Sequence, residues 1–248
     1  MSLTLAAGLV LAVLATAFMS GIFGMAGGMV LMLVLALAVP AATAMVIHGV
    51  VQFASNSWRT LLWRQHVRWD LTGRQMLGSL SAAAVAAVIA FRPNTAVTLI
   101  GLGLLPWLQL ALPRRFSPSI ERPGMAYLCG FTSTACHLVA GVSGPLYDVF
   151  FQTTSLDRRG VVATKAAGQC IGHMMKTLYA GALLAGPLNP WDDVSPWFLA
   201  IAILAAFAGT SLSRPVLERL SDVNFFRYTR WVLLVVGTIS LWQGVMRL

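Results

Sequence analysis

Residues 95–112 read TAVTLIGLGLLPWLQLAL, a stretch of eighteen residues without a charged side chain. A helix that spans the hydrocarbon core of a bilayer needs about 20 consecutive, mostly apolar residues. Similar uncharged stretches recur at 31–39, 77–91, 197–210 and 231–242. Only 10% of the 248 residues are charged and 58% are hydrophobic, whereas roughly a quarter of a soluble domain is charged. The sequence therefore predicts an all-α, polytopic membrane protein.

About ten hydrophobic segments are expected, in two groups of five. A basic, proline-containing linker, 113–123, separates a first membrane repeat at 1–112 from a second at 124–248. The segments of the first repeat are predicted at roughly 3–20, 22–39, 43–63, 75–91 and 95–112. Those of the second are predicted at roughly 124–141, 143–155, 160–185, 196–213 and 226–246. Residues 3–20 lack the basic residues that precede the apolar core of a signal peptide, and we interpret them as a retained span.

The basic residues indicate the orientation of these segments. Twelve of the 17 Lys and Arg fall in four predicted loops, at 64–74, 113–123, 156–159 and 214–230. The loops on the other side contain only Arg92 and Arg247. By the positive-inside rule, the basic loops and the linker face the cytoplasm and both termini face outside. This distribution explains the net charge of +9 without nucleic-acid binding.

An odd number of segments per repeat makes the second repeat enter the membrane in the opposite sense to the first. Inverted repeats of this kind are common in secondary transporters. A shift of 117 residues aligns a polar stripe on segment 43–63 with one on 160–185. Members of each stripe recur at helical spacing and share one face. The aligned pairs are His48 with Lys165, Gln52 with Gln169, Asn56 with His173, and Arg59 with Lys176.

Glycine-rich elements occur at corresponding places in the two repeats. The first contains Gly27-Gly28 and the second contains Gly144-Pro145. We predict a helix break at membrane depth in each, followed by a helix N-terminus, which favours an anion. The alternative is that these glycines only allow close packing of helices.

The paired glycine elements, the stretch Val162-Ala163-Thr164-Lys165 and the 5+5 layout resemble the TauE/SafE family of sulfite and organosulfonate exporters. The resemblance covers nearly the whole chain. It departs from the usual pattern at Met25-Ala26, Ile47-His48 and Ser143. The resemblance implies a multi-pass secondary transporter of the bacterial inner membrane. Such a protein exports a small sulfur-containing or carboxylated anion, without a cofactor, by alternating access around a site at mid-membrane.

Cations inside spans are costly unless they face a cavity or a partner. The site is expected to use the two lysines for anion binding, the amides and Thr164 for directed hydrogen bonds, and His48 and His173 for a proton-coupled step. The predicted substrate-binding residues are Gly27, Gly28, His48, Gln52, Asn56, Gly144, Thr164, Lys165, Gln169, His173 and Lys176. Two interpretations stay open for Arg59, Lys165 and Lys176, because a long basic side chain near a helix end also extends to the membrane interface.

Other functional classes fit the sequence less well. The alternative transport function is a histidine-using metal-ion permease, but no HxxxH or HxxxD pair falls within one span. The chain has no GxxxxGK[ST] loop for nucleotide hydrolysis and no HExxH or GxSxG motif. We therefore do not expect an enzyme. The three cysteines lie in apolar surroundings without a CxxC pair and predict no disulfide framework.

Overall fold

The computed structural model describes residues 2–23, 25–92, 94–113, 116–183, 189–192, 194–219 and 222–248. These residues form ten α-helices and no β-strand, which confirms the all-α prediction. The helices are α1 (Leu3–Phe23), α2 (Ala26–Ala38), α3 (Ala41–Leu62), α4 (Trp69–Val88), α5 (Thr95–Ala111), α6 (Met125–Ala140), α7 (Gly144–Phe151), α8 (Arg158–Leu178), α9 (Pro196–Arg219) and α10 (Asp222–Val245). A short 3-10 helix, Arg64–His66, precedes α4, and a π-helical turn, Tyr179–Leu183, follows α8.

Each predicted segment corresponds to one helix, but two helices are shorter than the hydropathy suggested. α2 begins at Ala26 instead of residue 22, and α7 ends at Phe151 instead of residue 155. Two helical stretches, Leu3–Ile22 and Pro196–Ser213, are long and apolar enough to cross a membrane by themselves. Three shorter helices, α2, α5 and α6, are also apolar.

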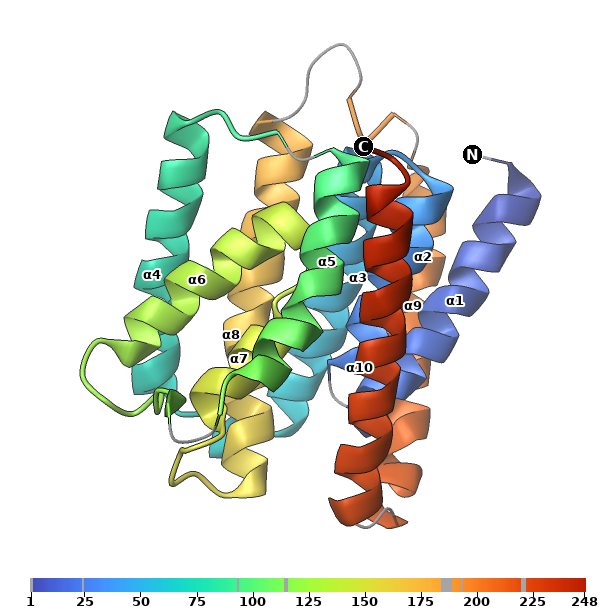
Figure 1. The fold of residues 1–248 in the computed structure, drawn as a ribbon. Helices are drawn as coiled ribbons and strands as arrows, with labels where there is room; N and C mark the ends of the chain where they lie inside the picture. The colour runs from blue at the N-terminus through green and yellow to red at the C-terminus, as the bar shows by residue number, and fades with distance from the viewer. Residues whose placement is uncertain are drawn as a thin grey trace.

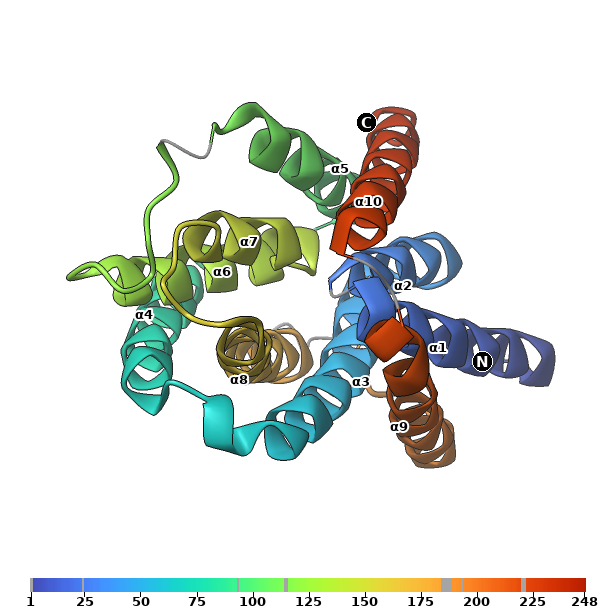
Figure 2. The ribbon, with the colours of Figure 1, turned by 90° about the horizontal axis from the view of Figure 1, so that it is seen from below.

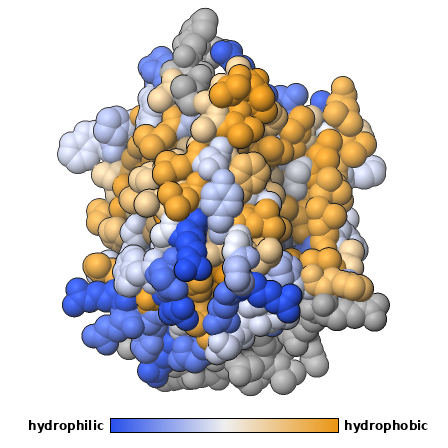
Figure 3. Space-filling view, turned by 90° about the vertical axis from the view of Figure 1, so that its left-hand side faces the viewer, coloured by the Kyte–Doolittle hydropathy of each residue, from blue (hydrophilic) through white to orange (hydrophobic). Residues whose placement is uncertain are grey.

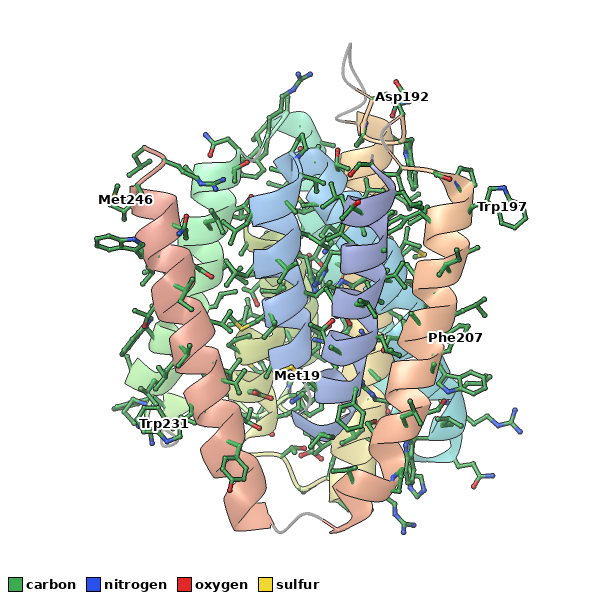
Figure 4. The ribbon with its side chains drawn as sticks, turned by 90° about the vertical axis from the view of Figure 1, so that its right-hand side faces the viewer. Met19, Asp192, Trp197, Phe207, Trp231 and Met246 are labelled. Carbon is green, nitrogen blue, oxygen red and sulfur yellow. The ribbon has the colours of Figure 1, made fainter. Side chains whose placement is uncertain are left out.

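Both termini lie at the same end of the helical bundle (Figure 1). The turn between α3 and α4 and the loop between α7 and α8 lie at the opposite end, where the basic residues of the sequence gather. Figure 3 shows one side of the molecule with an apolar band above a hydrophilic lower end. Trp197 and Trp231 project outward near opposite ends of the bundle, with 80% and 64% of their surfaces exposed (Figure 4). Exposed tryptophans at two such levels are typical of membrane interfaces.

Four helix pairs have the most extensive contacts: α1 with α9, α3 with α8, α4 with α6, and α5 with α10. Seen from below, α8 lies inside the curve formed by α3, α4 and α6, and it packs against all three (Figure 2). The polar face of α3 is buried, including His48, Gln52 and Asn56. A polar helix face turned into a membrane bundle needs polar partners there, so α3 and α8 mark the place to look for a site.

One carboxylate of the basic linker makes several contacts with the loop after α7. Glu121 accepts hydrogen bonds from Ser155 N (2.7 Å), Ser155 Oγ (2.7 Å) and Thr154 Oγ1 (2.8 Å). These donors, the backbone N–H of Ser155 first, hold the pKa of the Glu121 carboxyl below its usual value. The carboxylate therefore stays ionised at neutral pH and keeps 119–121 beside the loop between α7 and α8.

The closest helix crossing depends on two glycines. A Cβ at Gly78 of α4 would meet the backbone of Tyr127 and Phe131, and a Cβ at Gly130 of α6 would meet the backbone of Gln75. The backbones of α4 and α6 thus touch, as small residues permit in membrane bundles.

The substitution Gly78→Ala should therefore lower the free energy of unfolding by about 1–3 kcal/mol, because the added methyl group forces the two backbones apart. The matched control is Gly73→Ala on the same helix, where a Cβ meets nothing within 4 Å. Thermal denaturation in detergent measures both variants. Equal stability of the two would show that the close crossing does not limit stability.

Candidate functional site

Two helix breaks meet in the middle of the bundle. α1 ends at Phe23 and α2 begins at Ala26, whereas α6 ends at Ala140 and α7 begins at Gly144. Gly141 has a φ of +75°, a conformation that favours glycine. The sequence analysis placed Gly27 and Gly28 in the first break, but both lie in the first turn of α2. Gly27 packs tightly there against the Thr16 carbonyl and Ser20, so it is a packing residue.

A narrow cavity of about 20 Å³ lies between these breaks and the polar faces of α3 and α8. This volume holds a water molecule, so the cavity has to widen for a larger solute. Seven of the eleven predicted binding residues line it: Gly28, His48, Gln52, Asn56, Gly144, Gln169 and His173. Six residues that we did not predict complete the lining: Ser20, Met25, Arg59, His137, Val142 and Ser143.

The cavity lining favours negative charge. The N-terminal residues of α2 and α7, represented by Gly28 and Gly144, reach it from two sides. The first backbone N–H groups of a helix lack intrahelical partners and carry partial positive charge. Arg59 adds a guanidinium, and the lining contains no carboxylate among the residues that the structure describes. An anion would therefore find donors and positive charge in this cavity, and little repulsion.

Arg59 occupies one end of the cavity. Its Nη1 donates to Asn56 Oδ1 at 3.4 Å, while Asn56 Nδ2 donates to the Gln52 carbonyl at 2.9 Å. From His48 to Arg59 the α3 face extends over about 16 Å at 1.5 Å per residue. Of the two interpretations of Arg59, the geometry matches the one in which it faces the cavity.

Three imidazole rings form a cluster beside the cavity. The ring centroids of His137 and His173 are 4.4 Å apart, and those of His48 and His173 are 5.4 Å apart. Ser143 Oγ lies 3.1 Å from His137 Nε2. His173 Nδ1 is buried and has no hydrogen-bond partner among the described residues. In the described part of the chain, no group of three or more His, Cys, Asp or Glu side chains is arranged to hold a metal ion.

His137 was absent from the predicted site although the sequence contained a signal for it. The shift of 117 residues that aligns the two polar stripes also aligns His137 with Ser20. Both residues precede a glycine-rich break and both line the cavity. The alignment was applied only to segments 43–63 and 160–185, so this pair was missed.

Lys176 lies next to the cavity and not in its lining. Its Nζ donates to the Gly141 carbonyl and contacts His48 Nδ1, both at 2.7 Å. His48 Nε2 is 2.8 Å from the Gly28 carbonyl, which only accepts. His48 therefore carries its proton on Nε2 and accepts from Lys176 at Nδ1. This Lys176–His48 link joins α8 and α3 to both helix breaks.

Two further predicted residues lie outside the cavity lining. Lys165 forms an ion pair with Asp148, whose other carboxylate oxygen accepts from Gln109 Nε2 at 3.3 Å. Lys165 is therefore neutralised by a partner within the protein and does not line the cavity. Thr164 Oγ1 accepts from the Arg68 backbone N–H at 3.0 Å, which fixes the loop before α4 instead of contacting a solute.

Comparison with known proteins gives one match. The model of the family described as "Sulfite exporter TauE/SafE" matches residues 9–240. No curated protein and no solved structure matches the chain.

The Lys176–His48 link allows a prediction about stability. The substitution Lys176→Met keeps the length of the side chain but leaves the Gly141 carbonyl and His48 Nδ1 buried without this donor. We expect a loss of about 1–3 kcal/mol in the free energy of unfolding, measured by thermal denaturation in detergent. Arg74→Met, at an exposed position of α4, is the control and should change stability little. A Lys176→Met protein as stable as the control would mean that the link contributes no net stability.

Proposed function

Because the chain belongs to the sulfite exporter TauE/SafE family, we propose that it moves a small sulfur-containing or carboxylated anion across the bacterial inner membrane by alternating access. Members of this family are integral membrane transporters and not enzymes. The observation that carries the proposal is the cavity lining. It combines the Arg59 guanidinium, two helix N-termini and the Gln52 and Gln169 amides, with no carboxylate among the described residues.

Corresponding positions of the two repeats meet in the cavity, which supports an inverted repeat. A shift of 117 residues relates four pairs of lining residues: Ser20 with His137, Met25 with Val142, Gln52 with Gln169, and Asn56 with His173. A binding site at the interface of two inverted copies is the usual arrangement in secondary transporters.

The contacts between helices also correspond between the two proposed repeats. Replacing each helix by the one five places further along turns the α1–α9 pair into α6–α4, α3–α9 into α8–α4, and α2–α10 into α7–α5. All of these pairs are in contact. The pairs α3–α8 and α5–α10 become themselves. This pattern supports a pseudo-two-fold axis that relates 1–112 to 124–248, with 113–123 as a cytoplasmic linker.

The two ends of the cavity differ, and the difference suggests how access alternates. The Lys176–His48 link corresponds, by the same shift, to Lys165 and Arg59. At the first end, a histidine accepts from a lysine and the elements are held together. At the second end, Arg59 lines the cavity and Lys165 is paired with Asp148, so no such link joins the two cations. We infer that the first end is closed here, and that a bound anion draws Arg59 and Lys165 together to close the second.

The imidazole cluster provides groups for coupling transport to protons. His48, His137 and His173 lie together with Lys176 beside an anion site, and these are the titratable groups that face one another there. Unperturbed histidine titrates near neutral pH. A proton taken up by the cluster would offset the charge of the anion, so that the two cross together.

A histidine-using metal-ion permease is the second candidate, because three imidazoles cluster at the cavity. Arg59 in the same lining opposes a divalent cation. Flux measurements in proteoliposomes under an imposed membrane potential distinguish the two by the sign of the transported charge. Competition among sulfite, thiosulfate, sulfoacetate, taurine and small carboxylates then identifies the anion.

The substitution Arg59→Gln should reduce sulfite flux in proteoliposomes by about 10- to 100-fold, because a charge-assisted hydrogen bond to the anion is lost. Arg74→Gln removes an exposed arginine from α4, outside the cavity lining, and serves as the matched control. Equal flux through both variants, with equal amounts in the membrane, would remove Arg59 from the site.

A second substitution tests proton coupling. His173→Gln keeps a polar side chain in the cavity but cannot take up a proton, so the pH dependence of anion flux should become flatter. The measurement is initial flux between about pH 5.5 and 8, the range in which unperturbed histidine changes charge. A profile like that of the unmodified protein would exclude His173 from the coupling step.

A further inference from the structure

A second, larger cavity lies on the outside of the bundle and shares no lining residue with the first. Its volume is about 520 Å³, in the usual size range of ligand sites. It is a groove between the lower parts of α3 and α4, with α8 as its floor. Figure 2 shows α3 and α4 on either side of α8, joined by the turn that contains Arg64–His66. We call this the α3–α4 groove.

The interior of the α3–α4 groove suits a hydrocarbon chain. Leu61, Met76 and Ile171 are among its lining residues. The hydroxyl side chains in the lining are already bonded within the protein. Ser57 Oγ contacts Cys170 Sγ at 3.4 Å, and Thr60 Oγ1 donates to the Asn56 carbonyl at 2.8 Å.

Thr72 completes this set, because its Oγ1 donates to the Arg68 carbonyl at 3.1 Å. The groove therefore offers apolar surface and few free hydrogen-bonding groups. A polar solute would find few hydrogen-bonding partners there. An acyl chain would pack against the apolar lining on one side and against neighbouring lipid on the other.

The basic end of the α3–α4 groove suits a phosphate. Arg64 lines it and is exposed, and no carboxylate of the described residues pairs with its guanidinium. The neighbouring Arg68 is paired with Asp70 at 2.8 Å, and Arg159 lies over the Trp63 ring at 5.7 Å. Arg64 is thus the basic side chain of the groove lining, and its guanidinium can pair with an outside partner.

The depth of the groove in the membrane also fits a ligand with a hydrocarbon chain and a phosphate. Trp69 forms part of the lining and is 59% exposed, as expected for an aromatic residue at the headgroup level. The apolar interior lies on the membrane side of Trp69 and Arg64, along α3 and α4. Basic pockets between spans next to a basic membrane face are places where anionic lipids bind.

We propose that the α3–α4 groove is a binding site for an anionic phospholipid of the leaflet at the basic end of the bundle. One acyl chain lies in the groove over α8, and the phosphate of the headgroup pairs with Arg64. This site is separate from the anion cavity, so the proposal does not depend on which solute is transported.

The first test fills the groove. Gly73 lines it, and a Cβ at this position meets nothing within 4 Å. Gly73→Leu therefore places a side chain in the groove without a clash in the protein. The control is Gly8→Leu on the exposed face of α1, where a Cβ also meets nothing within 4 Å.

Binding is measured by native mass spectrometry of delipidated protein in detergent, titrated with phosphatidylglycerol and with phosphatidylcholine of the same chains. Gly73→Leu should weaken binding of both lipids by at least about tenfold, because several buried methylene groups are displaced. Gly8→Leu should bind as the unmodified protein does. Equal affinity of the two variants would overturn the site.

The second test removes the charge. Arg64→Gln should reduce the preference for phosphatidylglycerol over phosphatidylcholine by about fivefold, whereas Arg74→Gln should leave it intact. An unchanged preference would refute the role of Arg64.

A photoactivatable phosphatidylglycerol should label residues 57–76 of the unmodified protein, and labelling confined to other segments would refute the site without any variant. A groove occupied by a second copy of the chain would instead give a dimer that Gly73→Leu dissociates.

Discussion

Backbone groups at membrane depth must be hydrogen-bonded, buried in protein or turned toward a polar cavity. The two helix breaks, one just before α2 and one at 141–143, place such groups inside the bundle. Lys176 donates to the Gly141 carbonyl in the second break, and His48 donates to the Gly28 carbonyl in the helical turn that follows the first break. The polar faces of α3 and α8 therefore first satisfy the breaks, and the cavity occupies the space that remains between them.

This arrangement assigns different roles to basic residues that the sequence could not separate. Arg59, Lys165 and Lys176 all interrupt predicted apolar segments. Arg59 faces the cavity, Lys176 holds the breaks, and Lys165 is paired with Asp148. Of the three, only Arg59 lines the cavity. A substitution at Lys176 therefore affects the architecture of the site as well as any charge it contributes.

Hydropathy predicted about ten helical segments because mostly apolar stretches recur along the whole chain, and helical spacing predicted the polar faces of α3 and α8. Both methods are local. The partner of Lys165 could not be predicted, since Asp148 belongs to another helix and periodicity says nothing about contacts between helices. Thr164 was assigned to the site because it adjoins Lys165, yet it faces the Arg68 backbone. Gly27 and Gly28 were placed in the break because glycine permits irregular backbone, but Gly27 serves close packing inside α2.

The Glu121 contacts have a mechanical consequence. Segment 117–121 is bonded to 150–155 through Ser117, Ile120 and Glu121, so the latter part of the connecting peptide belongs to the second half as a rigid attachment. These hydrogen bonds lie within the second half and do not join the two halves. The two halves are held together by packed helices and by loop contacts such as that from the Arg68 N–H to Thr164 Oγ1. The connecting peptide adds one copy of each half to every molecule.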